Sequence, residues 1–594
     1  MKDNSSVPVA LTDNVYIDCL LGYARWVGSS ISFAFPTSAS NFPDTWPWNT
    51  RPEIFLAAPT DFQTNVTYWL SQVSSFTQLT FVSGNAATST LRWGLATDFT
   101  VSAGANMPDN SSWAGDMYFS FMNYSSPKPG GPVSHIIAHE LGHALGLKHS
   151  FDGSPISPLN RDSNEYTVMS YRQSVQFLPG TGILNGGTSS PDEYSQTYMT
   201  SDIAALQQLY GANFAFNSSD SVYRFDPTSG QMFVNGQAQD PPSGAKVYRT
   251  IWDGGGNDTY DLSSFAQNQQ VDLTPGGWTT FSSSMLGGGF YGLDAQGNRL
   301  FDPSGNGMIF TAPGNIANAL LYQSDVRALI ENALTGSGND TIIGNQADNI
   351  FDGGSGTDTA VFSGPSSKYR LTFANGKWTV QDKTGADGTD TLINMERLQF
   401  ANKTIKTDSK APGSYTDLPE SLWHFCIVAF SAAPGVEYMN QMADAYRSGL
   451  SVQTIVDIFT SKNQFTDVYP TNLSHVDLAS ALVKNVVKGS ASLVVKQGAI
   501  NDIVAALDIG WTVGEMIYTV FGNLAGKPLD DPTWGNTAHQ FQNEMAVAKY
   551  YTNIMGQSTT DLSTLRQVLA PVDQNTDVST TDHIATLIGM ALMA

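Results

Sequence analysis

The stretch SHIIAHELGHALGLKHS, residues 134–150, holds four of the eight histidines in a chain of 594 residues. It fits the pattern H-E-x-x-H-x-x-G-x-x-H at His139, Glu140, His143, Gly146 and His149. Residues four apart lie on one face of a helix, so His139 and His143 can bind one ion. Gly146 can adopt a positive φ that ends the helix, and the chain can then bring His149 back to the same ion.

This spacing predicts a catalytic zinc site. Three neutral imidazoles leave one coordination position of zinc open to water, whose pKa the ion lowers to about 7. Glu140, beside the ion rather than on it, would act as the general base and then protonate the leaving amine. The alternative, a helix that carries histidines by chance, is rare in a chain so poor in histidine. His135 lies one turn before His139 and is expected to pack beside the site.

A second pattern repeats every nine residues: TGSGNDTII begins at residue 335, GNQADNIFD at 344 and GGSGTDTAV at 353. In the ideal repeat, G-G-x-G-x-D-x-U-x, glycines and aspartate surround calcium, while the apolar U position faces the inside of a parallel β-roll. Since one coil contains two repeats, alternate repeats should stack with calcium between them. The expected ligands are Gly336, Gly338, Asp340, Gly354, Gly356 and Asp358. The weaker copy at residues 385–393 is equally well explained as an ordinary turn.

Composition separates the chain into three regions and restricts its partners. With a formal net charge of −24, the protein repels nucleic acid and anionic lipid, whereas clustered acid suits calcium. Residues 1–215 mix strand and helix patterns, residues 216–405 are rich in Gly, Asn, Asp and Thr, and residues 416–594 show apolar residues at helical spacing. The expected fold is a multidomain α+β protein with a C-terminal all-α domain.

Two further stretches follow the histidine motif: YTVMSY at residues 166–171 and DIAALQQLYGAN at residues 202–213. Together with that motif and the nonapeptides, they resemble the serralysin family of metzincin zinc proteases, which are RTX exoproteins, over roughly residues 15–365. The resemblance implies a metzincin-type protease domain in residues 1–215 and a calcium-binding β-roll domain in residues 216–405. It also implies one catalytic zinc ion and several structural calcium ions.

The resemblance assigns roles to individual residues. Met169 would form an apolar floor under the histidines, and Tyr171 would ligate zinc at rest and swing away to hydrogen-bond the transition state. A buried aromatic without a catalytic role is the alternative for Tyr171. WDGGGND, residues 252–258, resembles a separate serralysin calcium site, and the ligands this implies are Asp253, Gly255 and Asp258.

Residues 416–594 lie beyond the resemblance to serralysins. AVAKYYTNIMG, residues 546–556, resembles a helical repeat domain of RTX and surface-layer proteins, which implies a cell-surface or S-layer partner, support of secretion, or a plain cap on the roll. We expect no cleavable N-terminal secretory signal and no membrane span. RTX exoproteins leave the cell through type I secretion machinery, so the resemblance implies an extracellular protein, with attachment to the cell surface as an option.

The N-terminal segment 1–28 raises the question of a pro-segment. Asp18 and Cys19 lie there, and some metzincins are held inactive by a carboxylate or thiol on zinc, but no switch motif surrounds these two residues. Packing of the segment on the protease domain is the simpler explanation. The second cysteine, Cys426, is distant in sequence, so no disulfide framework is expected.

The leading functional hypothesis is a secreted, calcium-stabilised zinc metalloendopeptidase with Glu140 as general base. It would bind protein or peptide substrates along an edge strand near residues 101–107. One alternative is a processing protease of narrow specificity, recruited to a cell-surface or S-layer protein by residues 416–594. Another is a calcium-dependent surface-binding protein with an inactive protease domain.

Overall fold

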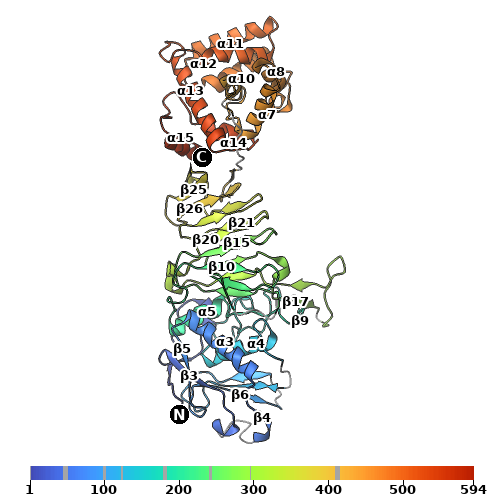
Figure 1. The fold of residues 1–594 in the computed structure, drawn as a ribbon, viewed down its shortest axis with the longest axis vertical. Coiled ribbons are helices and arrows are strands. Elements are labelled where there is room, and N and C mark those ends of the chain that lie inside the picture. The colour runs from blue at the N-terminus through green and yellow to red at the C-terminus, as the bar shows by residue number, and fades with distance from the viewer. Residues whose placement is uncertain are drawn as a thin grey trace. The chain divides into compact units, whose positions relative to one another are not determined.

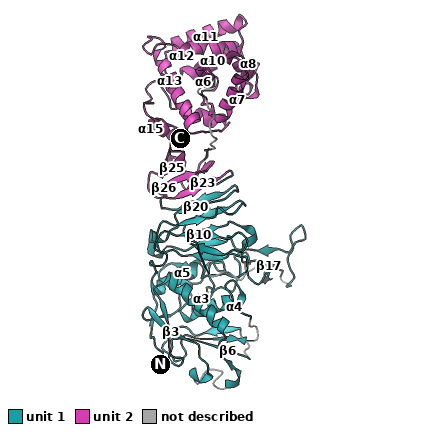
Figure 2. Ribbon diagram, in the orientation of Figure 1, with its two compact units in different colours: residues 1–347, 354–356 teal, residues 348–353, 357–594 magenta. Residues whose placement is uncertain are grey.

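The computed structural model describes residues 2–43, 51–97, 102–121, 125–177, 184–239, 244–294, 296–407, 415 and 417–593. The chain divides into two compact units, coloured separately in Figure 2. The N-terminal unit comprises residues 1–347 and 354–356, and the C-terminal unit comprises residues 348–353 and 357–594. Both units combine helices with strands, so the predicted multidomain α+β class is confirmed. The domain boundaries expected from the sequence, at residues 1–215, 216–405 and 416–594, remain predictions.

The N-terminal unit begins with a mixed sheet in the order β5-β3-β6-β8-β7, with β4 beside β6. Its strands are β3 (Ser30–Ala34), β4 (Phe55–Leu56), β5 (Thr80–Ser83), β6 (Leu91–Ala96), β7 (Ala103–Ala105) and β8 (Asp116–Ser120). Every residue of β6 is buried, as expected of a central parallel strand that is covered on both faces. β7 runs antiparallel to β8 and ends the order, so an edge strand lies in the range 101–107, of which Val101 is outside the described residues.

Three helices share the core of this region. They are α3 (Thr60–Phe76), α4 (Pro132–Ala144) and α5 (Thr200–Tyr210). Buried residues recur every three or four positions on α3, as Phe62, Val66 and Trp69 do. The Trp69 indole Nε1 donates to Ser134 Oγ at 3.0 Å and links α3 to the first turn of α4. Because α4 carries the histidine motif, this core positions the candidate site.

The N-terminal segment, which includes β1 (Ser6–Pro8), α1 (Val15–Asp18) and β2 (Ala24–Trp26), is built into the same core. Trp26 is fully buried, and its indole Nε1 donates to the carbonyl of Ala144, the last residue of α4, at 2.8 Å. The Gly22 N–H donates to the Gly146 carbonyl at 2.8 Å. These bonds hold the turn that follows α4, so the segment supports the histidine motif.

Asp18 and Cys19 are both buried within this segment. The Asp18 carboxylate accepts hydrogen bonds from the backbone N–H and the hydroxyl of Thr12, each at 2.8 Å. Burial raises the pKa of the Cys19 thiol to about 11, which keeps it protonated at neutral pH. Neither side chain joins the histidine cluster found among the described residues, and this placement does not favour a switch on the metal.

Short strands from the glycine-rich region follow in the N-terminal unit. β10, β14 and β20 run parallel to one another, and β15 runs parallel to β21. Their bounds are β10 (Val222–Phe225), β14 (Thr259–Asp261), β15 (Gln270–Asp272), β20 (Asn332–Leu334) and β21 (Thr341–Ile343). Tyr260, Val271 and Ile342 are fully buried between more exposed neighbours, which is the alternation expected of the nonapeptide pattern.

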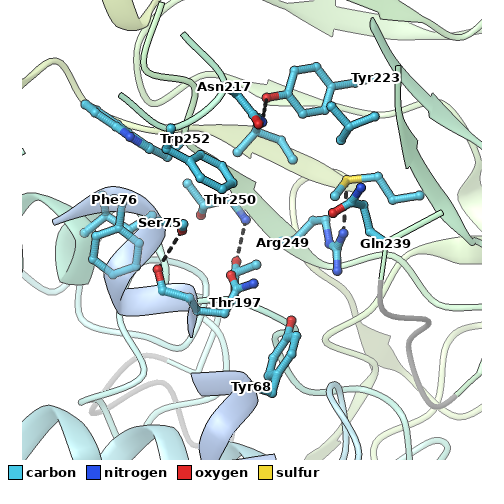
Figure 3. Close-up of a pocket in the computed structure, with 16 residues that line it drawn as sticks. Tyr68, Ser75, Phe76, Thr197, Asn217, Tyr223, Gln239, Arg249, Thr250 and Trp252 are labelled. Carbon is cyan, nitrogen blue, oxygen red and sulfur yellow. Dashed lines mark hydrogen bonds between the residues drawn. The ribbon is translucent and has the colours of Figure 1, made fainter. Parts of the chain in front are cut away.

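β13 (Arg249–Ile251) joins the glycine-rich region to the helices of the same unit. It pairs with β19 (Ile316–Asn318), which pairs in turn with β16 (Trp278–Thr279). The Thr250 N–H donates to Thr197 Oγ1 at 2.8 Å, just ahead of α5. A cavity of about 100 Å³ lies at this seam. Figure 3 shows Tyr68 of α3 and Trp252 among the side chains that line it. None of the zinc-motif histidines lines this cavity.

Three antiparallel strands form an arm on the N-terminal unit, in the order β18-β17-β9. They are β9 (Leu184–Thr188), β17 (Phe290–Leu293) and β18 (Ile309–Phe310). Figure 1 shows the arm projecting from the unit. Phe177, Phe290 and Phe310 pack together at its base. No sequence pattern described above predicts this arm.

The C-terminal unit contains further short strands. β22 (Ile350–Asp352) runs parallel to β26 (Thr389–Ile393), and β23 (Thr359–Val361) runs parallel to β27 (Arg397–Gln399). Antiparallel pairing adds β24 (Tyr369–Ala374), β25 (Lys377–Asp382) and β28 (Thr404–Lys406). Phe351, Ala360 and Leu392, all at U positions of their repeats, are buried. The apolar position of each repeat therefore faces inward even where the glycines are missing.

Helices make up the rest of the C-terminal unit. They are α6 (Glu420–Phe430), α7 (Gly435–Arg447), α8 (Val452–Thr460), α9 (Asn463–Thr466), α10 (His475–Val487), α11 (Leu493–Asp508), α12 (Val513–Ala525), α13 (Gly535–Lys549), α14 (Leu562–Leu569) and α15 (Thr581–Met593). Several start at a serine that accepts a backbone N–H from the first turn, as Ser451, Ser474 and Ser492 do. Across the described residues, no helix has the length and apolar character needed to cross a membrane.

α15 packs directly on a strand of its own unit. A Cβ at Gly589 would lie 1.6 Å from the carbonyl oxygen of Leu371 in β24, so only glycine permits this approach. The Ser366 hydroxyl donates to the Met593 carbonyl at 2.7 Å near the end of the same helix. The helices of the C-terminal unit are thus attached to its strands.

Candidate metal centre

The three histidines of the motif converge at the end of α4. One nitrogen of each side chain, His139, His143 and His149, lies within 4.8 Å of the others. The Nε2 atoms of His143 and His149 are 3.1 Å apart. Gly146 has a φ of +106°, and a Cβ there would meet the Ala24 carbonyl at 2.7 Å, so the turn that returns His149 requires glycine.

Each imidazole is oriented through its other nitrogen. His139 Nδ1 lies 2.7 Å from the Val168 carbonyl, and His143 Nδ1 lies 2.8 Å from the Leu147 carbonyl. His149 Nδ1 lies 2.6 Å from the Asp152 carboxylate. When Nδ1 donates to such an acceptor, Nε2 keeps its lone pair and points toward the shared centre.

The donor set fits zinc. Burial lowers the pKa of His139 to about 4 and that of His143 to about 3, so both imidazoles are neutral at physiological pH. Neutral imidazole nitrogens are standard zinc ligands, and three of them on one side leave the opposite side open for water or substrate.

Glu140 lies beside this cluster and is buried. Burial raises the pKa of its carboxyl group to about 8. A carboxyl group that exchanges its proton near neutral pH is suited to general acid–base catalysis. The negative charge of Glu140 also contributes to the raised pKa of Tyr171, after the larger effect of burial, so these two groups interact electrostatically.

Tyr171 lies against the histidine cluster and remains accessible. Its ring centroid is 4.7 Å from that of His149 and 5.7 Å from that of His139. The side chain is 64% exposed, so the buried-aromatic alternative does not describe it. Phe151 contacts Tyr171 at 5.0 Å and stacks on His149 with an interplanar angle of 6°. An exposed phenol in this position can turn toward a bound substrate.

Met169 is fully buried beneath α4. A Cβ at Gly142, which lies between the two helical histidines, would come within 2.7 Å of the Met169 sulfur, so the helix packs closely on this side chain. Asp202, at the start of α5, accepts the Val168 N–H at 2.9 Å and the Thr167 hydroxyl at 2.6 Å. These bonds hold the turn that carries Met169.

Two carboxylates that sequence reasoning missed hold the site together. Asp162 accepts the hydroxyl of Ser150 at 2.5 Å and that of Ser170 at 2.8 Å, and so joins the residue after His149 to the residue after Met169. Asp152 orients His149, as described above. The i+3 spacing of Asp152 from His149 was a usable signal, whereas nothing in the sequence marks Asp162.

His135 lies outside the convergent cluster. It is buried, its Nε2 lies 3.5 Å from Asn164 Nδ2, and its ring centroid is 4.9 Å from that of Tyr194. Burial lowers its pKa to about 3. The structure places this imidazole as a packing residue in the first turn of α4.

The stretch at residues 252–258 gathers buried carboxylates. Asp253 Oδ1 accepts the Gly255 N–H at 2.9 Å, and Asp258 Oδ1 accepts the Ser221 N–H at 2.7 Å. Asp258 Oδ2 is buried with no hydrogen-bond partner among the described residues. Glu331, which sequence reasoning missed, accepts the Asp258 N–H at 2.7 Å. This arrangement leaves oxygen atoms available to a cation.

The carboxylates at this stretch repel one another. Burial, followed by the charge of Asp253, raises the pKa of Asp258 to about 8. Burial raises the pKa of Glu331 to about 7. Carboxyl groups with such values bind protons at neutral pH unless a cation replaces them, which is the chemistry expected of a calcium site.

The repeat glycines make close backbone contacts. A Cβ at Gly336 would lie 1.7 Å from the Phe265 carbonyl, and one at Gly338 would lie 2.5 Å from the Gln267 carbonyl. A Cβ at Gly354 would lie 2.1 Å from the Gly336 carbonyl, so these two predicted partners approach each other. All three positions therefore exclude a side chain. Gly356 has a φ of +149°.

The repeat aspartates are buried in separate units. In the N-terminal unit, Asp340 Oδ1 accepts the Gln269 N–H at 2.7 Å. In the C-terminal unit, the Asp358 N–H donates to Glu396 Oε2 at 2.7 Å, which repeats the bond between Asp258 and Glu331. Glu396 is a second carboxylate that the repeat pattern did not single out.

Comparison with known proteins relates the chain to metalloproteases. Residues 212–288 match the family described as Peptidase M10 serralysin C terminal. The chain is 34% identical over 240 residues to Metalloprotease AprA of Pseudomonas entomophila, which covers 39% of this chain and 41% of that protein. It is 32% identical over 256 residues to Serralysin G of Dickeya chrysanthemi, covering 41% and 43% of the two chains. Each match thus spans less than half the length of the relative. The chain is serralysin-like, a relative of proteins named as metalloproteases.

Proposed function

We propose that the protein is a zinc metalloendopeptidase that calcium stabilises. The observation that carries this proposal is the convergence of three histidine nitrogens, with Glu140 beside them and Tyr171 against them. The names of the relatives support the same activity. His139, His143 and His149 would hold the zinc ion. When bound, zinc supplies a Lewis acid that polarises the scissile carbonyl and makes a water molecule a better nucleophile.

The chain's own groups would perform the remaining steps. Among the described residues β7 is the last strand of its sheet, and its outer edge would offer backbone N–H and C=O groups to an extended peptide, which would add as a strand and present its scissile bond to the histidines. The Glu140 carboxylate would take the proton of the attacking water and deliver it to the leaving nitrogen. The Tyr171 hydroxyl would donate a hydrogen bond to the oxyanion that develops on the scissile carbonyl.

Calcium would neutralise the buried carboxylates of the glycine-rich region. We infer a site at Asp253, Gly255 and Asp258, with Glu331 beside it, because Asp258 Oδ2 is buried and has no hydrogen-bond partner in the part of the chain that the structure describes. We extend the same role to the β-roll turns that contain Gly336, Gly338, Asp340, Gly354, Gly356 and Asp358. Extracellular modules bind calcium at about 10⁻⁴–10⁻³ M. A requirement of this size favours action outside the cell. The resemblance to RTX exoproteins supports export through type I secretion machinery.

Glu140→Gln tests the proposed chemistry. The amide keeps the size of the side chain but cannot take a proton, so we expect kcat/KM for casein to fall by about 100-fold or more. Bound zinc, measured by atomic emission, should be unchanged. Glu53→Gln removes an exposed carboxylate elsewhere in the same unit and is the matched control. An active Glu140→Gln protein, or a purified protein that holds no zinc yet cleaves casein, would overturn the proposal.

A narrower role as a processing protease deserves a separate test. Leu493 and Val494 at the start of α11 are 83% and 82% exposed, which favours a protein partner for the helices. Changing both residues to serine leaves the protease region untouched. A general protease would then cleave casein and cell-surface proteins as before, whereas a recruited protease would lose only its surface-layer substrate.

A further inference from the structure

Lys148 lies immediately before His149, and its ammonium group binds three backbone carbonyls. Nζ donates to the carbonyl oxygen of Cys19 at 2.7 Å, to that of Asp152 at 2.5 Å and to that of Pro155 at 2.9 Å. An ammonium group has three N–H donors, so each one has an acceptor here. Hydrogen bonds from a charged donor are stronger than those between neutral groups. The charged end of this side chain is therefore held in place.

These carbonyls belong to two segments that meet at the histidine turn. Cys19 follows α1 in the N-terminal segment and is buried. The backbone of Lys148 contacts the same segment, because its N–H donates to the Leu20 carbonyl at 2.8 Å. Asp152 and Pro155 lie in the loop that continues from the histidine motif. Lys148 thus connects this loop to the buried N-terminal segment.

His149 depends on this loop in a way that the two helical histidines do not. Those two are oriented by the carbonyls of Val168 and Leu147, which are both fully buried. His149 is oriented by the carboxylate of Asp152, whose side chain is 54% exposed. Because packing does not enclose this carboxylate, its position depends on the backbone of Asp152. That backbone is the part of the loop that Lys148 holds.

We propose that Lys148 is a positioning residue for the candidate zinc site. Its ammonium group fixes the backbone of Asp152, so that the carboxylate stays against His149 Nδ1 and keeps Nε2 directed toward the ion. Lys148 acts through Asp152 and His149 rather than as a ligand. This inference rests on the proposed function, because it concerns the same metal.

Lys148→Met tests this role through metal affinity. Methionine keeps an unbranched side chain of similar length but donates no hydrogen bond. We expect the zinc dissociation constant, measured by competition with a chromogenic chelator, to rise about tenfold. The visible absorption spectrum of the cobalt-substituted protein should also change, because His149 is no longer held. Lys246→Met removes another lysine of the same unit that donates to backbone carbonyls, and it should change neither quantity. Unaltered affinity and spectrum in Lys148→Met would overturn the proposal.

A double-mutant cycle shows whether Lys148 acts through Asp152. Asp152→Ala alone should weaken zinc binding, and the addition of Lys148→Met should then weaken it further by less than about twofold. Equal losses on Lys148→Met in the two backgrounds would mean that the lysine affects the metal by another route, and the positioning role would be wrong.

A chemical rescue keeps the test independent of how well Lys148→Met folds. Lys148→Cys is aminoethylated, which restores an ammonium group at nearly the same reach, or is treated with iodoacetamide, which adds a neutral group of similar size. Cys19 and Cys426 should react slowly, because burial raises the pKa values of their thiols to about 11 and about 12. Only the aminoethylated protein should regain the zinc affinity of the wild type. Equal affinities of the two products would refute the role of the ammonium group.

These measurements require no hydrolysis, so they separate this inference from the proposed function. If the wild-type protein binds zinc but cleaves no casein, the proposed function fails, and the Lys148 variants still decide the positioning role. If the wild-type protein cleaves casein and the variants bind zinc as tightly, the proposed function stands and the positioning role is wrong. A wild-type protein that binds no zinc overturns both.

Discussion

The histidine turn and the turn at residues 252–258 both bring metal-ligating atoms together, but the electrostatic cost of doing so differs between them. His139 and His143 are neutral, and their Nδ1 atoms already have backbone partners. Asp258 and Glu331 are carboxyl groups whose pKa values burial raises to about 8 and about 7. Neutral ligand groups can be brought together by the protein alone, whereas buried acidic ligand groups oppose folding until a cation binds.

This difference separates the tasks of the two metals. Zinc would bind a site that the core around α4 already forms, so its contribution is chiefly chemical. Calcium would bind turns whose own charges resist closure, so its contribution is chiefly to stability. Selective removal of each ion should give the largest measurable effect that tests this difference.

Removing zinc should abolish activity and leave the fold intact. We expect kcat/KM for casein to fall by more than about 100-fold, or about 2.7 kcal/mol of barrier, with little change in Tm. Removing calcium while zinc is replenished should lower Tm by roughly 5 °C or more. Casein hydrolysis and differential scanning fluorimetry on the same samples measure both effects. A large fall in Tm on loss of zinc alone would contradict the contrast.

Gly336→Ala should destabilise the repeat turn that contains Gly336. Its Cβ would lie 1.7 Å from a backbone carbonyl that cannot move aside, so we expect a loss of about 3 kcal/mol or more in the free energy of unfolding. Gly385→Ala is the matched control, since Gly385 has a φ of +78° but nothing within 4 Å of its Cβ, and should cost about 1 kcal/mol. Urea unfolding followed by circular dichroism gives both values; equal losses would show that close approach is unimportant.

Asp162→Ala should loosen the histidine turn without removing a ligand. The hydroxyls of Ser150 and Ser170 lose their shared acceptor, which costs about 2 kcal/mol of stability. We expect kcat/KM to fall by about tenfold and zinc affinity to weaken in parallel. Asp508→Ala, which removes an exposed carboxylate on α11, should leave both unchanged. Unaltered zinc affinity in the Asp162 variant would mean that the two hydrogen bonds of Asp162 do not position His149.

Asp258→Asn should have the smallest effect, and its sign should depend on calcium. The folded-state pKa of about 8 lies above the ordinary value of 3.8, so this carboxyl opposes folding increasingly as pH rises from about 4 to 8. Without calcium at pH 8, the amide should therefore stabilise the protein by about 1 kcal/mol. With calcium, the same change should reduce the gain in Tm. A variant less stable than wild type without calcium would contradict this electrostatic account.

Local patterns in the sequence are sufficient for part of the candidate site. His139 and His143 face one centre because a helix repeats every 3.6 residues, and Gly146 provides the turn that returns His149. The buried U positions of the nonapeptides follow in the same way from the two-residue period of a strand, as Ile342 illustrates. Each of these features depends on residues that are close along the chain.

Other features arise only from contacts between distant segments. Glu331 meets Asp258 across 73 residues, and Tyr194 meets Phe290 at the root of the arm. The sequence does not distinguish Asp162 from the other aspartates, because only the fold places it between the hydroxyls of Ser150 and Ser170. No periodic pattern marks such residues, because the free energy of their contacts depends on which surfaces the whole chain brings together.

By itself, the sequence determined the helical spacing of the histidines, the turn that follows them, the repeated glycines and the mixed α+β class, since these depend on backbone geometry over a few residues. The tertiary structure decided which carboxylates orient the histidines, the place of β7 at the end of its sheet, the arm beside α4 and the packing of α15 on β24. These depend on burial, which raises or lowers pKa values and excludes water only after distant parts of the chain have packed together.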